Sequence, residues 1–537
     1  MLGASRAGRF RGSRRRADHR TRAGATLVAV HRLLAGHTLV AVLGLGVPFA
    51  NVAWSAERVV YPDGSGDFPT IQLAIWASQD GDVVSLAPGT FVEAGIDFQG
   101  KAITLQALNG PGTSSLVAGA SGLFELDSGE GPETRISGLV FTGLMGNHGV
   151  AVSCDGSSPT FSECLFDAVR GPNTTALYAT GAGPLVENCV FRGCVTALDL
   201  RGSTSNPITN CRFEDNRTGL AILGGNGARV VSSEFSGNGN GLLAPGFQGN
   251  LLIEDCLFRS NDEGAYLRGD LGRFTITNSE FLDNMDYGAY VLPREATISA
   301  CTFRGNGGAG EFGALAATDT ELTDCTFEAN RALHAGAVDG ASLMLRRCVF
   351  RDNSANGYGE EDGFGGALRL NALCEIDECL FVGNSGGHGA AIRVEFGNTT
   401  LRDCTFAFNT GYFASVFDLG AAAVRAERIL VYGSERGPSV ACAGTSTFAV
   451  ACSDFFGNED GDWTSCIADQ LGQDGNITAD PLFCDADGDD FGLLSDSPCL
   501  ATNNGCGDMG RYGQQCDVVP ILSSSWGRVK GQFYGSR

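Results

Sequence analysis

A set of charged residues recurs at one position of a repeated sequence. When the repeats are aligned on a Gly-Ala-apolar segment, the next position holds Asp339, Arg369 and Arg393 in successive repeats, with Glu395 two residues further along. Arginines beside carboxylates at a fixed spacing are residue types that general acid–base catalysis can use. The same four residues could instead form a salt-bridge ladder between coils, so a catalytic and a structural role are both open.

An insertion within the same repeats carries a second set of candidate residues. Most repeats are 22 to 25 residues long, but 31 residues separate Phe350 from Phe381, and the excess falls in residues 356–364. Loops on a rigid scaffold commonly carry function, which makes this segment a candidate contact for a cation or a glycan. A tolerated insertion at the scaffold edge is the simpler interpretation. The residues in question are Tyr358, Glu360, Glu361, Asp362 and Phe364.

A third acidic segment suggests calcium. Asp485, Asp487 and Asp489 supply the oxygen ligands that this cation prefers. However, the glycine is misplaced for an EF-hand loop and the distal glutamate is absent, so a solvated acidic turn is the competing interpretation. The sequence requires no cofactor, and Ca²⁺ is the one cation that it suggests.

A single sequence frame must position these residues. The frame is an apolar residue, two residues, Cys, one residue, Phe, two residues and Asn, as in Ile298, Cys301, Phe303 and Asn306. A period of about 20 to 50 residues indicates stacked supersecondary units, and no leucine-rich frame recurs. The Asn suits a sharp turn in which left-handed backbone geometry is tolerated. The Gly-Ala-apolar segment then begins another strand.

These features predict an all-β fold, a single-stranded right-handed parallel β-helix of about 14 coils. Stacking of the coils supplies the core that one coil cannot form alone. The predicted register places four phenylalanines on top of one another inside the helix: Phe258, Phe281, Phe303 and Phe327.

The repeats resemble those of known proteins. Phe350-Arg-Asp-Asn353, followed by Gly365-Gly-Ala-Leu368, is similar to the repeats of chlamydial polymorphic outer membrane proteins. More broadly it resembles secreted bacterial right-handed β-helix proteins of the pectin-lyase-like superfamily. This superfamily contains lyases, hydrolases, esterases and adhesins, so the resemblance implies a fold and no single activity. Its polysaccharide lyases use a strand-face Arg or Lys as base beside calcium-binding carboxylates, which implies that role for Arg369 or Arg393.

One histidine imitates an enzyme motif. Gly387-His388-Gly389 copies the GHG segment of polygalacturonases, but their NTD and paired-Asp segments do not occur within the coils. His388 is therefore interpreted as a solvent-side turn residue.

The two ends of the chain differ from the repeats. Residues 1–56 combine an Arg-rich start, an apolar run and a cleavage-like tripeptide, which is the layout of a secretory signal peptide. Residues 57–105 are expected to form an N-terminal cap and the first strands, with a short helix within 69–79 that covers the open first coil. The β-helix is assigned to residues 106–440, a Cys-rich C-terminal cap to 441–516 and a flexible tail to 517–537.

Cysteine is used in two ways. Cys256 lies between Ser233 and Ser279 of neighbouring repeats, and in-register strands hold side chains about 4.8 Å apart, wider than a disulfide prefers. Most ladder cysteines are therefore predicted to be buried thiols. The seven cysteines of residues 442–516 are expected to form disulfides in an oxidising compartment, although the sequence leaves their pairing open.

Charge limits the partners. The chain has a net charge of −24, and removing residues 1–56, with nine Arg and one Asp, leaves 28 basic and 60 acidic side chains, or −32. Such a surface argues against nucleic acid or an anionic membrane as partner, and no integral membrane domain is expected in the mature chain. We expect a secreted or cell-surface β-helix that binds or adheres, without catalysis, to a glycan or another cell-surface component. The alternative is a polysaccharide lyase or hydrolase that acts on acidic polysaccharide.

Overall fold

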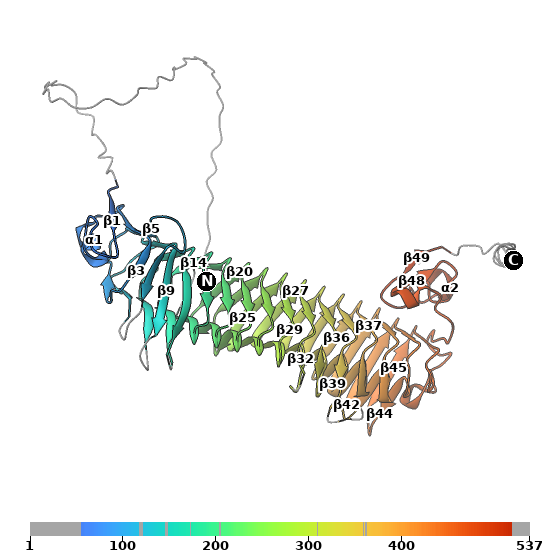
Figure 1. Cartoon of the computed structure of the whole chain (residues 1–537). Coiled ribbons are helices and arrows are strands. Elements are labelled where there is room, and N and C mark those ends of the chain that lie inside the picture. The colour runs from blue at the N-terminus through green and yellow to red at the C-terminus, as the bar shows by residue number, and fades with distance from the viewer. Residues whose placement is uncertain are drawn as a thin grey trace, which may run out of the picture. The chain divides into compact units, whose positions relative to one another are not determined.

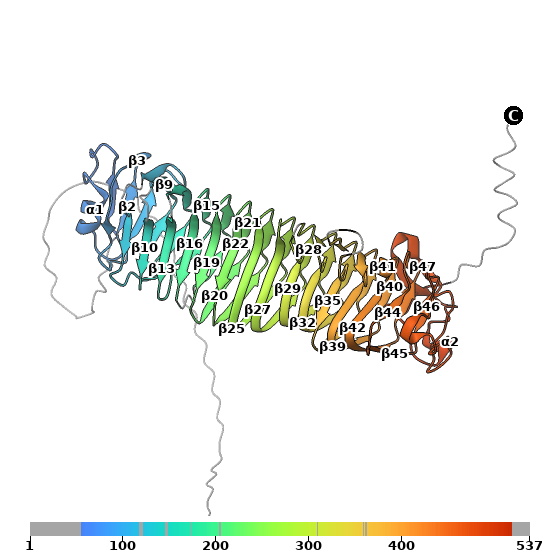
Figure 2. The same cartoon turned by 90° about the horizontal axis from the view of Figure 1, so that it is seen from below.

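A computed structural model describes residues 55–117, 122–144, 149–171, 173–202, 206–308, 310–357, 359 and 362–517. The expected signal peptide, apart from residues 55 and 56, and the expected tail after residue 517 lie outside the described residues. The described chain forms stacked coils of parallel strands (Figure 1). The same coils are seen from below in Figure 2.

Each coil contributes strands to two or three sheets. Sheet A has 26 strands, sheet B has 16 short strands that carry the marker phenylalanines, and sheet C has four strands near the C-terminal end of the stack. Sheet C consists of β31 (Arg331–Ala332), β34 (Ser354–Ala355), β38 (Ser385–His388) and β41 (Thr410–Ala414). Sheet B consists of β3 (Gly89–Phe91), β6 (Ser114–Val117), β9 (Leu139–Leu144), β12 (Leu165–Arg170), β15 (Val190–Arg192), β18 (Arg212–Glu214), β21 (Glu234–Ser236), β24 (Leu257–Arg259), β26 (Glu280–Leu282), β28 (Thr302–Arg304), β30 (Thr326–Glu328), β33 (Val349–Arg351), β37 (Leu380–Val382), β40 (Thr405–Ala407), β43 (Leu430–Tyr432) and β46 (Asp454–Phe456).

Sheet A forms the face on which the charged candidates lie. Its strands are β1 (Glu57–Val60), β2 (Val83–Leu86), β4 (Ile96–Asp97), β5 (Thr104–Ala107), β7 (Phe124–Leu126), β8 (Arg135–Ser137), β10 (Val150–Asp155), β11 (Thr160–Ser162), β13 (Thr175–Thr180), β14 (Leu185–Glu187), β16 (Thr196–Arg201), β17 (Ile208–Thr209), β19 (Thr218–Leu223), β20 (Gly227–Val231), β22 (Asn240–Pro245), β23 (Asn250–Glu254), β25 (Glu263–Thr277), β27 (Tyr287–Ser299), β29 (Leu315–Thr323), β32 (Val338–Arg346), β35 (Leu368–Asn371), β36 (Cys374–Asp377), β39 (Ile392–Arg402), β42 (Phe417–Glu427), β44 (Val440–Cys442) and β45 (Thr447–Ala451).

The interior repeats one aromatic side chain from coil to coil. Phe258, Phe281, Phe303 and Phe327 are fully buried, and the centroids of successive rings lie 4.8, 4.6 and 4.9 Å apart in a parallel stack. This confirms the predicted register. The stacking fixes each coil relative to its neighbours, and therefore also fixes the outward-facing side chains.

The asparagines of the frame form a second interior ladder. The Nδ2 group of Asn306 donates to Oδ1 of Asn330 at 3.0 Å and to the carbonyl of Phe281 at 2.8 Å. The expectation that the Asn itself occupies the left-handed turn is wrong. The residue before it does so, with φ of 53° at both Ala329 and Asp352, and this bend turns the Asn side chain inward.

The number of coils exceeds the expected value of about 14. The helix makes about 18 turns, of which 16 contribute a strand to sheet B. The additional coils place Phe91, Leu116, Val431 and Phe455 in the phenylalanine column. Since these coils lack the full Cys-Phe-Asn frame, the sequence frame undercounts them.

The N-terminal helix is present where it was predicted. α1 (Ile71–Ala77) is capped by Thr70, whose Oγ1 accepts a hydrogen bond from the backbone N–H of Leu73 at 3.2 Å. Ile71, Ala74 and Ile75 are fully buried against the first strands. The helix therefore covers apolar surface of the first coil, which would otherwise be an open edge.

The cysteines divide as expected. Twelve cysteines of the coils, Cys256 among them, are buried free thiols. Near the C-terminus, disulfides join Cys442 to Cys466, Cys452 to Cys506 and Cys484 to Cys516. Cys499 is the seventh and remains a buried thiol.

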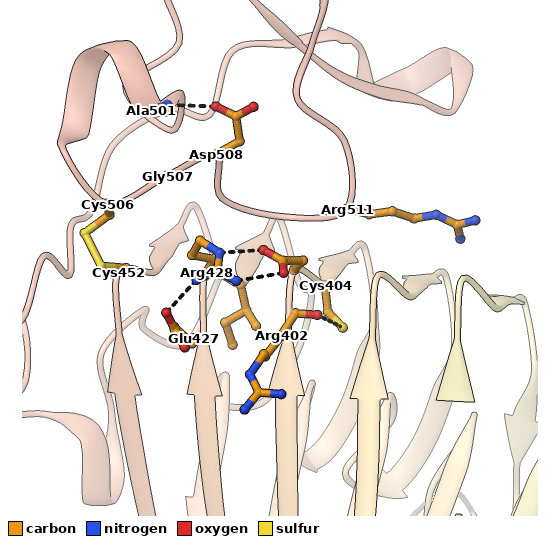
Figure 3. A network of polar contacts seen from close by, with 12 residues as sticks. Arg402, Cys404, Glu427, Arg428, Cys452, Ala501, Cys506, Gly507, Asp508 and Arg511 are labelled. Atoms are coloured by element: carbon orange, nitrogen blue, oxygen red, sulfur yellow. Dashed lines mark hydrogen bonds and ion pairs between the residues drawn. A yellow bond between two sulfur atoms is a disulfide. The ribbon is translucent and has the colours of Figure 1, made fainter. Parts of the chain in front are cut away.

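The C-terminal cap folds back onto the outside of sheet B. It contains β47 (Phe483–Asp485), β48 (Asp490–Leu494), β49 (Gln514–Cys516) and α2 (Ala501–Asn504), with 3₁₀ turns at Ser465–Ile467 and Ala486–Gly488. Arg428 forms two hydrogen bonds with Asp403, at 2.6 and 2.8 Å, beside the loop that carries Gly507 (Figure 3). Arg511 reaches further and donates to the carbonyl of Cys348 at 2.9 Å.

Candidate functional site

The charged candidates lie side by side on sheet A. Asp339 on β32 pairs in register with Arg369 on β35, Arg369 pairs with Arg393 on β39, and Arg393 pairs with Asp418 on β42. Alanines bound the column, at Ala316 on one side and Ala441 on the other. The polar column is therefore four coils long, and we call it the charged ladder, including Glu395, which lies two residues beyond Arg393.

Ion pairs connect the whole charged ladder. Arg369 contacts Asp339 at 3.6 Å and Glu395 at 3.4 Å. Arg393 contacts Glu395 at 3.0 Å and Asp418 at 2.8 Å. Both arginines thus bridge two carboxylates each, and the predicted salt-bridge ladder between coils is present.

The inner part of the charged ladder is shielded from water. The side chains of Arg393 and Asp418 are 13% and 7% exposed, so this ion pair is largely buried. The Nε atom of Arg393 is buried and has no hydrogen-bond partner in the described part of the chain. Partial burial strengthens the interaction between the charges, and also makes the loss of one partner costly.

Two carboxyl groups of the charged ladder have pKa values displaced in opposite directions. Burial raises the pKa of Asp339, although the charge of Arg369 opposes this. Burial also acts to raise the pKa of Glu395, but the hydrogen bond and charge of Arg393, together with Arg369, outweigh it and hold that pKa below its usual range. Asp339 therefore holds a proton more readily than Glu395 does.

A row of aromatic rings follows the charged ladder at the bend between sheets C and A. The ring of His388 stacks on Phe364 at 4.8 Å and on Phe413 at 4.3 Å, and His334 lies 5.3 Å from Phe364 on the other side. Each ring precedes a ladder residue by five positions, so the same coils carry both sets. We call these four rings the aromatic row.

Two contacts join the aromatic row to the charged ladder. The Nδ1 atom of His388 lies 2.6 Å from a carboxylate oxygen of Asp418, and the guanidinium of Arg393 lies 5.6 Å from the Phe364 ring centroid. His388 is thus not a simple solvent-side turn residue, because its ring is held between two phenyl rings and a carboxylate. Because the rings stack face on face, the combined surface offers ring edges, with the partly exposed Phe413 ring in the row, beside a line of hydrogen-bonding groups.

The predicted insertion contributes one residue to this surface. Phe364 joins the aromatic row, whereas Asp362 lies in a turn closed by its own N–H, which donates to the Gly359 carbonyl at 3.1 Å. Tyr358, Glu360 and Glu361 lie outside the described residues.

Sequence reasoning missed four members of the site. His334, His388, Phe413 and Asp418 were not selected as site residues, although the five-residue spacing of Phe364 to Arg369 is repeated by His334 to Asp339, by His388 to Arg393 and by Phe413 to Asp418. That spacing was the available signal. It was obscured because the residue types differ from coil to coil.

The acidic segment proposed for calcium lies in the C-terminal cap. Asp485 accepts a hydrogen bond from the N–H of Gly488, and Asp489 forms an ion pair with Arg351 at 2.6 Å. Among the described residues, no group of three or more His, Cys, Asp or Glu side chains could hold a metal ion. Calcium binding by Asp485, Asp487 and Asp489 stays a prediction.

The coils identify the family of the chain. A family model described as the right handed beta helix region matches residues 148–294 and 263–451. These matches together span more than half of the 537 residues, and the chain belongs to this family. No curated protein matches the chain.

Solved structures with the same fold include carbohydrate-active enzymes. One is a mannuronic acid specific polysaccharide family 6 lyase from human gut microbiota, with 12% identity, 64% of this chain and 86% of that chain covered, and a TM-score of 0.35. Another is the catalytic unit of a GH87 alpha-1,3-glucanase from Streptomyces thermodiastaticus, with 16% identity, 77% and 70% covered, and a TM-score of 0.27. A third is pectate lyase Pel9A, with 14% identity, 87% and 98% covered, and a TM-score of 0.22.

At these identities the likeness shows the fold alone, and the low TM-scores carry no argument about activity. The family match confirms the right-handed β-helix that the repeats predict. None of these comparisons supports the closer resemblance to chlamydial outer membrane proteins. Across the described residues, no helix is long and apolar enough to cross a membrane.

Proposed function

We propose that this protein is an exported β-helix that binds a polysaccharide on the surface formed by the charged ladder and the aromatic row. The observation that carries the proposal is the row itself, in which Phe364, His388 and Phe413 stack at coil spacing beside connected polar groups. Aromatic side chains flanked by a few fixed hydrogen-bonding groups are typical of small-molecule sites. Phe413 is 43% exposed, so part of this aromatic surface is accessible to a ligand.

The charges of the site favour a neutral glycan. Three carboxylates, those of Asp339, Glu395 and Asp418, face two guanidiniums, which leaves one carboxylate in excess. A uronate polymer would bring further negative charge to a chain whose net charge is already −24. A neutral polysaccharide meets no such repulsion.

Export is supported by the disulfides. Bonds such as Cys452–Cys506 persist in oxidising compartments and are rare in the cytosol. This agrees with a secreted or cell-surface location, the setting in which a glycan partner is encountered.

Binding can be measured on an affinity gel containing a neutral α-glucan, polygalacturonate or alginate. Phe413→Ala is expected to weaken retention by the neutral glycan by roughly three- to tenfold, the range of one aromatic contact. Tyr61→Ala is the matched control, since Tyr61 is similarly exposed, at 44%, but lies in the N-terminal region. Retention that is equal in wild type and Phe413→Ala would contradict the proposal.

A glycoside hydrolase is the second candidate, and the opposed pKa displacements of Asp339 and Glu395 favour it. Inverting hydrolysis requires a neutral carboxyl that protonates the leaving oxygen and a carboxylate that activates water, about 6.5–9.5 Å apart. Asp339 and Glu395 contact opposite parts of the same Arg369 guanidinium, which is compatible with such a separation. A lyase would instead need a guanidinium to lose its proton while carboxylates contact it, and arginine resists this.

The two candidates differ in one measurement. Release of reducing ends from a neutral polysaccharide by wild type, lost in Asp339→Asn while binding is retained, would establish hydrolysis. If wild type binds the glycan and releases no reducing ends, the protein is a binding module.

A further inference from the structure

A cavity of about 190 Å³ lies on sheet C, beside the aromatic row. Gly386 and Gly411 belong to its lining, together with the side chains of Ser385, Thr410 and Tyr412. Gly411 has no room for a side chain, because a Cβ there would lie 2.0 Å from the Ala414 carbonyl oxygen, and Gly386 is tightly packed, since a Cβ there would lie 3.1 Å from the Gly366 nitrogen. The cavity is smaller than the ~300–1,000 Å³ typical of sites for drug-sized ligands, so it suits one ring rather than a folded chain.

One side of the cavity is polar. Ser385 Oγ donates to Ser354 Oγ at 3.0 Å, which donates to Oδ1 of Asn356 at 2.7 Å. This chain of bonds uses the amide oxygen of Asn356, and within the described residues its Nδ2 group has no partner. The hydroxyl of Thr410 lies in the next coil, because Ser385 and Thr410 are paired in register. Hydroxyl and amide groups at coil spacing match the alternating hydroxyls of a sugar ring.

The other side is aromatic. Tyr412 is 40% exposed, and the Arg436 guanidinium lies 5.0 Å from the centroid of its ring. The Tyr412 ring also meets Phe413 edge to face at 4.9 Å. Because Phe413 belongs to the aromatic row, the cavity and the proposed glycan-binding surface are in contact.

The cavity and the charged ladder occupy the same coils. Ser385, His388 and Arg393 follow one another in one coil, and Thr410, Phe413 and Asp418 do so in the next. A ligand that occupied both places would therefore follow the strands from sheet C towards sheet A. It would lie across the axis along which the coils stack.

We propose that this cavity is a second sugar-binding subsite that holds one pyranose ring of a neutral glycan. The glycan runs along the strands, at an angle to the axis on which the coils stack. The inference rests on the proposed function, since the same glycan occupies the aromatic row. Tyr412 supplies the ring face, and Ser385, Thr410 and Asn356 supply the hydrogen-bonding groups. A short oligosaccharide fills the aromatic row alone, whereas a longer one also reaches the cavity.

The test compares a disaccharide with a hexasaccharide of the α-glucan series, by calorimetry on the full chain. Tyr412→Ala is expected to weaken binding of the hexasaccharide roughly three- to tenfold and to leave the disaccharide unchanged. Phe413→Ala, the adjacent and similarly exposed aromatic residue, is expected to weaken both. Thr410→Phe, which fills the cavity without removing Tyr412, should reproduce the effect of Tyr412→Ala, and thermal unfolding of each variant reports its folding.

Each result decides between the two levels of the proposal. If Phe413→Ala alone weakens binding, the cavity is no subsite and the proposed function still holds. If Tyr412→Ala weakens the disaccharide as much as the hexasaccharide, the cavity is part of one continuous site, and the separate subsite is refuted. If wild type binds neither oligosaccharide nor the polymer, both the function and the subsite fail.

Discussion

The same coils carry two ladders that obey different rules. Inside, Asn330, Asn353, Asn384 and Asn409 repeat one side chain, with successive amide bonds of 2.9, 3.0 and 3.0 Å and no exposure to water. Outside, the charged ladder changes residue in almost every coil. An amide is both donor and acceptor and can bond to copies of itself, whereas stacked like charges repel.

This difference separates scaffold from site. The interior asparagine position can hold the same residue in every coil, so the repeat alone specifies it. A column of charged groups must instead be composed coil by coil, so that each guanidinium finds its carboxylates. Variation within a regular column is therefore where function is to be sought in this fold.

The largest expected effect tests the inner repeat. Phe303→Ala removes a fully buried ring from the stack and is expected to lower the free energy of unfolding by ~3–5 kcal/mol, as measured by denaturant titration. Thr302→Ala, at the adjacent outward-facing position, serves as control. A loss below about 1 kcal/mol for Phe303→Ala would show that the coils relax around the cavity.

Asp454 differs from the carboxylates of the charged ladder, because none of its hydrogen-bond partners in the described residues is a cation. Asp454 is completely buried under the C-terminal cap, where it accepts hydrogen bonds from Cys499 Sγ at 3.2 Å and the Ala479 N–H at 3.0 Å. Burial raises its pKa to about 7, and the nearby carboxylates of Asp462 and Asp480 act in the same direction.

Stability should therefore depend on pH at this residue. The folded protein retains a proton that the unfolded chain releases near pH ~4, so the stabilisation is complete below pH ~4 and is lost as pH rises through about 7. The loss amounts to at most about 4 kcal/mol. Asp454→Asn should flatten the unfolding free energy over this pH range, and an unchanged slope would refute the assignment.

The third effect breaks the outer ladder itself. Arg393→Met leaves Glu395 and Asp418 without one partner and is expected to cost ~2–3 kcal/mol, towards the lower end for a disrupted buried pair because some solvent remains. The pKa of Glu395 should rise, since Arg393 is what holds it down. Arg304→Met, at an exposed arginine of β28, should change the unfolding free energy little. If Arg393→Met and Arg304→Met changed the free energy of unfolding equally, Arg393 would contribute no more than an exposed surface arginine.

The smallest effect concerns the thiols. Cys256→Ser should change the unfolding free energy by less than about 1 kcal/mol, because Ser233 and Ser279 fill the same place in the flanking coils, and the backbone N–H of Cys256 already bonds to Ser279 Oγ at 3.1 Å. A larger loss of unfolding free energy, measured by denaturant titration, would mean that the cysteine thiol itself stabilises this position.

The features that repeat from coil to coil could be predicted from the sequence, whereas those that occur in only a few coils could not. The phenylalanine register, the buried thiols and the capping helix follow from spacing, because stacking repeats each environment. The aromatic row was missed since its members differ in type, and the pairing of Arg393 with Asp418 depends on rotamers that spacing does not define. The coils of Leu116 and Val431 escaped the count because another apolar residue replaces Phe in the column.

The contact of Arg511 with Cys348 spans 163 residues. Within the coils, contacts join neighbouring coils, so without the C-terminal cap the last strands could detach one at a time. Here the C-terminal cap crosses several coils and is tied by Cys452–Cys506, so these coils must open together. A protease would then find its first accessible sites elsewhere in the stack, and shortening of the protein by limited digestion should proceed from the N-terminal coils.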